Sequence, residues 1–236
     1  MPIRLSRWLA GQHRPAPGWV LVTAGLSPIL VTVAWLVAGT LQPASYSPVR
    51  DTVSALAGLG GTDRWIMTSA LFAVGGCYLA TAAGLAGLRA PARILLAVAG
   101  LSSIGIAASP EPAAGTTTRH LAWTALGAAT ITIWPAFTGR RSPGQPLILG
   151  TRGAAVVTTV FAGLLGWLLI ETQQGTLLGL AERVMTSIQT AWPFLVAVAL
   201  RQAALRPGPQ RAGPPPAALT AEGPGGPRSA RREPAR

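Results

Sequence analysis

The sequence predicts an all-α membrane protein, a polytopic bundle of about six transmembrane helices with both termini in the cytoplasm. Three observations lead to this fold class: the composition, six long apolar segments and the distribution of arginine. Of the 236 residues, 50% are hydrophobic and only 11% are charged. In a typical soluble domain about a quarter of the residues are charged. Long apolar runs are the usual reason for a much lower share of charged residues.

Six apolar segments are each near the roughly 20 residues that a helix needs to cross a bilayer core. They run over residues 19–41, 65–88, 91–108, 121–138, 154–170 and 184–200. The first follows a basic arm, but it is too long for a signal-peptide core and no A-x-A site follows it, so we expect an uncleaved span. All six are continuously apolar and lack the alternation of a membrane β-barrel.

The connections and flanks complete the expected organisation. The short connection 89–93 predicts an antiparallel hairpin of the second and third helices. Small residues in the second, third and fifth segments predict close helix approach. Residues 1–18 form a basic arm, residues 19–200 the transmembrane domain, and residues 201–236 a tail rich in Pro, Gly and Arg that we expect to be disordered and cytoplasmic.

The arginines orient the bundle. All nineteen basic residues are arginine, and with the N-terminus inside, fifteen lie on the cytoplasmic side and four on the outer side. This positive-inside bias predicts that both termini are cytoplasmic, and we expect the protein to lie in the plasma membrane. The inner arginines would favour anionic lipid headgroups. The absence of lysine, with abundant Ala, Gly and Pro, indicates a GC-rich, bacterial source.

The same distribution argues against a nucleic-acid partner. A net charge of +12 is in the range of nucleic-acid-binding proteins, but the arginines lie at the ends of apolar segments and in the tail. The acids are distributed in the opposite way: outside the tail, all of them lie in the outer loops or at their edges. These five are Asp51, Asp63, Glu111, Glu171 and Glu182.

The first outer stretch with candidate chemistry is 46–57. Its apolar residues recur at helical intervals and predict a short interfacial helix, which Asp51 or Ser47 could cap. Either Arg50, Asp51 and Ser54 line a polar site at the membrane surface, or the helix simply covers the bundle.

The second stretch ends where the fourth segment begins. His120, one of only two histidines in the chain, is the best candidate for a base or a metal ligand. Arg119 beside it is a candidate ligand contact. Arg119 and His120 could equally anchor the helix at the interface, with Trp123 in an aromatic belt.

The third stretch opens the last segment with Glu182 and Arg183. On a helix, Glu182, Met185 and Gln189 share one face because they are three and four residues apart. This face predicts either a polar site, with Arg183 and Gln189 as further ligand contacts, or a seam that joins helices.

Asp51, His120 and Glu182 together could bind a metal ion or transfer protons. However, the sequence has no metal-ligand spacing and no nucleotide-binding or hydrolase motif. We therefore predict no metal and no cofactor. Asp51 could instead pair with Arg119 or Arg183 as a structural clasp.

The three outer stretches also carry a family resemblance. They read Tyr46-Ser-Pro-Val-Arg-Asp-Thr-Val-Ser-Ala-Leu, Arg119-His-Leu and Gly179-Leu-Ala-Glu-Arg183. In this order they resemble the prokaryotic membrane family catalogued as domain of unknown function 998, over about residues 19–200. The resemblance implies six spans and no assigned activity.

Three functions fit these observations. A non-catalytic protein that binds lipid or a protein partner at its outer face asks least of the residues and is preferred. An outer-leaflet enzyme that modifies a lipid or envelope substrate would use His120 with Asp51 and Glu182. A small transporter is disfavoured, because ion-coupled transport usually needs ionisable groups near the bilayer midplane, where we expect only Ser, Thr and Cys.

Overall fold

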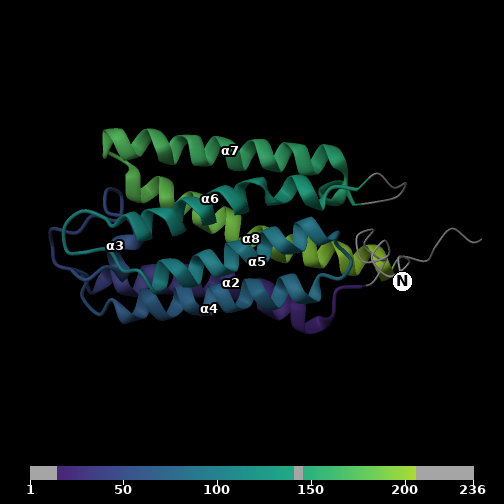
Figure 1. Ribbon diagram of the computed structural model, residues 1–236, viewed down its shortest axis with the longest axis horizontal. Coiled ribbons are helices and arrows are strands. Elements are labelled where there is room, and N and C mark those ends of the chain that lie inside the picture. The colour runs from purple at the N-terminus through teal and green to yellow at the C-terminus, as the bar shows by residue number, and fades with distance from the viewer. Residues whose placement is uncertain (1–14, 141–145, 206–236) are drawn as a thin grey trace, which may run out of the picture. The chain divides into compact units, whose positions relative to one another are not determined.

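A computed structural model describes residues 15–140 and 146–205 (Figure 1). Within these residues it contains six long α-helices, and each is long and apolar enough to cross a membrane. Their bounds are Gly18–Thr40 (α2), Trp65–Gly84 (α4), Ala90–Ala107 (α5), Thr118–Thr138 (α6), Thr151–Gln174 (α7) and Leu178–Leu205 (α8). The predicted all-α, six-span architecture is confirmed. Most of the N-terminal arm and of the tail predicted to be disordered lies outside the described residues.

Two shorter helices complete the described part of the chain. Helix α3 (Val53–Ala57) lies in the connection between α2 and α4, as the spacing in stretch 46–57 predicts, and a 3-10 turn, η1 (Leu147–Leu149), precedes α7. The described residues form no β-strand; Arg140 and Gly150 form one isolated bridge.

Helices α6, α7 and α8 begin three or more residues earlier than predicted, and the early starts of α6 and α8 have consequences for the site. Helix α6 begins at Thr118, where the side chain of Thr117 accepts a hydrogen bond from the amide of His120 (3.2 Å). Helix α8 begins at Leu178, so Glu182 and Arg183 lie in its second turn. Hydropathy locates the apolar centre of a helix, whereas capping and backbone hydrogen bonds decide its first residue.

The six long helices form a closed ring. Each packs on the next along the chain, from α2 and α4 through α5, α6 and α7 to α8, and α8 packs back on α2. The backbones of α4 and α5 approach most closely at two glycines. A Cβ atom on Gly75 would lie 2.7 Å from the carbonyl oxygen of Gly100, and one on Gly100 would lie 2.8 Å from that of Gly75.

The other glycines in the helices divide into two groups, those in close contact with a neighbouring side chain and those facing open space. Gly84 and Gly105 pack against Trp19 and Trp123, as expected for close helix approach. By contrast, a Cβ on Gly76, Gly163 or Gly166 would meet nothing within 4 Å. At these three positions glycine is not needed for packing within the described residues.

The outer surface of the ring is apolar. Large side chains such as Val22, Ile29, Val156, Leu169 and Ile170 are more than half exposed. A soluble protein rarely exposes so many large apolar side chains, whereas in a bilayer they face lipid tails as apolar as themselves. The ring is therefore the transmembrane part of a multi-pass membrane protein.

The two ends of the ring differ in charge. The α3 end carries α3 and the α2–α4, α5–α6 and α7–α8 connections; the opposite end carries the α4–α5 and α6–α7 connections (Figure 1). Every acid in the described residues lies at the α3 end or in the adjoining helix turns: Asp51, Asp63, Glu111, Glu171 and Glu182. Our prediction that this end faces outward is addressed by an experiment below.

Candidate functional site

The side chains of Thr52 and Glu182 hold the start of α3. The hydroxyl of Thr52 accepts a hydrogen bond from the amide of Ala55 (3.0 Å) and caps the helix. The prediction that Asp51 or Ser47 would cap it is wrong, because these two residues close a separate turn. In that turn the carboxylate of Asp51 accepts from the amide of Ser47 (2.6 Å).

Glu182 reaches the same helix from α8. Its Oε2 accepts from the amide of Val53 (2.6 Å), and its Oε1 accepts from the hydroxyl of Ser54 (3.4 Å). The amide of Val53 is one of the donors that a helix start leaves without an intrahelical partner. Glu182 therefore fixes the position of α3 relative to the last transmembrane helix.

Arg183 binds the chain just before α3. Its side chain is buried, with 5% exposed. Its Nη1 donates to three backbone carbonyl oxygens, those of Pro48 (2.7 Å), Asp51 (2.8 Å) and Gly179 (2.9 Å). Arg183 thus contacts Asp51 through the backbone carbonyl, and the described residues show no ion pair between the Asp51 carboxylate and Arg183.

The second guanidinium nitrogen of Arg183 donates to the hydroxyl of Tyr46. The guanidinium also lies over the ring of Trp35, 5.4 Å from its centroid, in a cation–π contact. Burial raises the pKa of the Tyr46 hydroxyl, and the positive charge of Arg183 only partly opposes this shift. Tyr46 is therefore neutral at physiological pH and serves as a hydrogen-bonding partner.

His120 makes a different contact at the same end. It is 3% exposed, and its Nδ1 lies 2.8 Å from the carbonyl oxygen of Ser109. Because a carbonyl only accepts, Nδ1 carries the proton. The other ring nitrogen, Nε2, lies 3.5 Å from a carboxylate oxygen of Glu111. The backbone of Glu111 in turn accepts from the amide of Leu59 (2.8 Å), so His120 links α6 to two loops.

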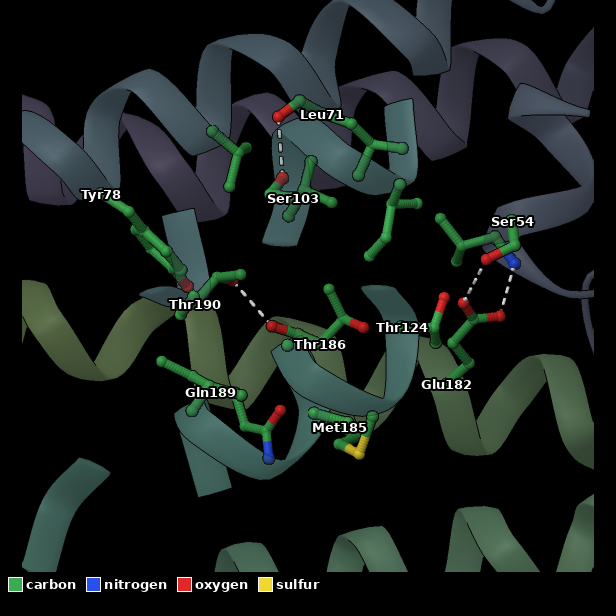
Figure 2. Close-up of a pocket in the computed structure, with 18 of the residues that line it drawn as sticks. Ser54, Leu71, Tyr78, Ser103, Thr124, Glu182, Met185, Thr186, Gln189 and Thr190 are labelled. Atoms are coloured by element: carbon green, nitrogen blue, oxygen red, sulfur yellow. Dashed lines mark hydrogen bonds between the residues drawn. The ribbon is translucent and has the colours of Figure 1, made fainter. Parts of the chain in front are cut away.

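A cavity of about 160 Å³ lies inside the helix ring, and all six long helices and α3 contribute to its lining. Glu182, Met185 and Gln189 project into it from α8 (Figure 2). This confirms that the three residues share one face. Gln189 follows Glu182 by seven residues, which is about 10 Å along the helix, so the cavity extends from the α3 end toward the middle of the ring.

Most polar groups in the cavity wall already have partners. The hydroxyl of Ser103 donates to the carbonyl of Leu71 (2.7 Å), and the amide nitrogen of Gln189 donates to the hydroxyl of Thr132 (3.1 Å). By contrast, the hydroxyl of Thr124 is buried without a hydrogen-bond partner in the described part of the chain. Among the described lining residues, Glu182 is the only carboxylate, and none is arginine or histidine.

The family described as protein of unknown function (DUF998) matches residues 11–199, well over half of the chain. The chain belongs to this family. No curated protein and no solved structure matches it. The predicted family resemblance is thus confirmed, and a DUF998 protein with six apolar helices is an integral membrane protein of unknown function.

The three stretches that resemble DUF998 all lie at the α3 end. The first and third contact each other directly, because Glu182 and Arg183 both bind residues between Tyr46 and Ser54. The second contributes His120, which binds the α5–α6 loop instead. In this DUF998 protein two of the three stretches therefore form one polar contact, and the other forms a neighbouring one.

The candidate site residues occupy several distinct positions. Asp51, His120 and Glu182 are each engaged in a separate contact, and no group of three metal-binding side chains occurs in residues 15–140 and 146–205. Arg50 and Arg119 are exposed. Ser54 and Gln189 line the cavity. The catalytic roles proposed for the first three stay predictions.

Sequence analysis missed two residues that complete this end of the DUF998 chain. Glu111 was counted among the outer acids but not paired with His120, because eight residues, six of them in the loop before α6, separate them. Glu171 is buried near the end of α7, where its carboxylate accepts from the amide of Leu177 (2.8 Å) and the hydroxyl of Thr176 (3.2 Å). An acid just before a Gly-containing turn was the available signal.

Proposed function

We propose that this DUF998 protein binds an amphiphile from the membrane in the cavity of the helix ring. The apolar part of the ligand occupies the cavity, and a hydrogen-bond donor in its head group binds Glu182. The observation that carries this proposal is a single carboxylate on the wall of an otherwise mainly apolar cavity. Ionisable residues inside membrane bundles are costly and usually mark functional sites.

The volume limits the ligand. A cavity of about 150 Å³ accommodates a benzene-sized molecule, and pockets for whole drug-sized ligands usually measure about 300–1,000 Å³. At about 160 Å³, the cavity fits a segment of one acyl or prenyl chain or a small amphiphile. A whole phospholipid would be too large.

The carboxylate of Glu182 limits the head group that the ligand can have. The carboxylate of Glu182 already accepts from Val53 and Ser54 on the α3 side, and each of its oxygens has capacity for another donor. A buried carboxylate favours a partner that donates or is positively charged. We therefore expect an ammonium, hydroxyl or amide head group, and discrimination against a carboxylate head group.

Binding accounts for the contacts better than catalysis does. Asp51 and His120 hold loops, and neither lines the cavity. We place the protein in the plasma membrane with both termini in the cytoplasm, so that the cavity is nearest the outer leaflet.

The test uses four probes of equal chain length: decylamine, decanol, decane and decanoate. Each is titrated into the full-length purified protein, and the thermal unfolding midpoint is recorded. We expect the amine and the alcohol to raise the midpoint more than decane does, and decanoate to raise it least. Glu182→Gln should remove the advantage of the amine over decane.

A pair of neighbouring alanines supplies the matched control. Ala128 lines the cavity, whereas Ala129 is exposed on the outer surface of the same helix. Ala128→Leu should fill part of the cavity and abolish the stabilisation by all probes, while Ala129→Leu should preserve it. Equal stabilisation of both variants would show that the probes bind elsewhere and would refute the proposal.

A further inference from the structure

Two arginines lie side by side at the end of the ring opposite α3. Arg89 directly precedes α5, and Arg140 follows the C-terminal end of α6. The indole nitrogen of Trp134 donates to the carbonyl oxygen of Ala92 (2.7 Å). This bond joins the last turns of α6 to the first turn of α5, and so holds the two arginines near each other.

One nitrogen of the Arg140 guanidinium is buried without a hydrogen-bond acceptor in the described residues. Arg140 as a whole is half-buried, and the fully buried nitrogen is Nη2. Burial lowers the pKa of Arg140, and the positive charge of Arg89 lowers it further. A buried donor with no acceptor is costly, and the like charge beside it adds to the cost.

Nearby groups do not supply the missing acceptor. All acids in residues 15–140 and 146–205 lie toward the α3 end. The neighbouring Arg93 is itself a cation, and it donates to the carbonyl oxygens of Ala82 (2.9 Å) and Ala83 (3.0 Å) at the end of α4. The described residues at this end therefore include no acid that could neutralise Arg140.

We infer that Arg89 and Arg140 form a binding site for a phosphate group, supplied either by an anionic phospholipid headgroup or by free phosphate. Guanidinium groups bind phosphate oxygens with paired, charge-assisted hydrogen bonds. The site lies where the transmembrane helices end, at the depth of lipid headgroups. This inference is independent of the ligand proposed for the cavity.

The experiment compares the full-length protein in nanodiscs of phosphatidylcholine alone, in nanodiscs that also contain phosphatidylglycerol, and in phosphatidylcholine nanodiscs with inorganic phosphate. We expect the thermal midpoint to rise in the second or third condition relative to the first. A rise with phosphatidylglycerol only assigns a lipid; an equal rise with inorganic phosphate assigns the free anion.

Arg89→Gln and Arg140→Gln should each abolish most of that rise. The affinity for short-chain phosphatidylglycerol should fall about fivefold, because an arginine near an anionic surface contributes about 1 kcal/mol. In phosphatidylcholine alone, Arg89→Gln should unfold at the same or a higher temperature than the wild type, since it removes like-charge repulsion from an exposed position. This measurement separates loss of the site from misfolding.

Arg152→Gln is the matched control, because Arg152 is exposed at the same end and its substitution removes the same charge. It should retain the response to phosphatidylglycerol. If Arg152→Gln lowers the response as much as the other two substitutions, the effect is general surface charge and the site does not exist. An unchanged midpoint of the wild type in both anionic conditions would also overturn the inference.

Discussion

Arg183 is the residue on which the α3 end depends most. Its guanidinium bonds to backbone carbonyls before α3 and to Tyr46, while the adjacent Glu182 bonds to the first residues of α3. Consecutive helical residues point about 100° apart, so the pair holds the same loop from two directions. The two side chains thus join chain segments that are more than a hundred residues apart.

We expect Arg183→Gln to lower the free energy of unfolding by about 3 kcal/mol, because several buried carbonyl oxygens lose their donor. Arg119→Gln is the control, since Arg119 is an exposed arginine at the same end, and its effect should stay within about 0.5 kcal/mol. Denaturant unfolding of both variants in one detergent measures the difference. Similar losses in the two variants would contradict the role assigned to Arg183.

At the scale of elements, the close contact between α4 and α5 depends on glycine at specific positions. The carbonyl oxygens of Gly75 and Gly100 each occupy the space that a Cβ on the other residue would need. Backbone cannot move aside as a flexible side chain can, so an added methyl group forces the two helices apart.

Gly75→Ala should therefore destabilise the protein by about 1–3 kcal/mol. Gly76→Ala on the next position should be neutral or stabilising by up to about 1 kcal/mol, because its Cβ meets nothing within 4 Å and alanine favours helix. Thermal unfolding of the two variants measures the contrast. If Gly76→Ala proves the more damaging, the α4–α5 register is wrong.

The sequence was sufficient to predict the helices but only part of the site. Hydropathy located six spans because bilayer thickness sets their length. Spacing on one helix placed Glu182, Met185 and Gln189 on one face. The acceptors of Arg183 could not be predicted, because backbone carbonyls occur at every residue. Likewise, Thr124 and Ser103 come together with Glu182 only through the ring, which no local pattern encodes.

On the scale of the whole molecule, the difference in charge between the two ends predicts the orientation of the bundle. The acids gather toward the α3 end, where Arg50, Arg64, Arg119 and Arg183 nearly balance their charge, whereas the described residues of the opposite end carry Arg89, Arg93, Arg140 and Arg152 and no acid. The retention of basic loops on the cytoplasmic side favours one insertion direction.

Reporter fusions at Asp63 and at Arg140 should therefore report opposite sides of the membrane. Alkaline phosphatase should be active at Asp63, and green fluorescent protein should fluoresce at Arg140. Exchanging the two reporters supplies the control. Activity on the same side at both positions would contradict six spans, and the reverse pattern would invert the orientation.

The contact between the first loop and α8 can form only late in translation. Residues 46–54 leave the ribosome well before Glu182 and Arg183 do, because about 130 residues separate them. Until α8 inserts, this loop lacks its donors and acceptors from the last helix, and the ring is open between α2 and α7. The cavity is consequently completed by the last helix to enter the membrane, and a nascent chain that stops before α8 lacks the Glu182 wall of the cavity.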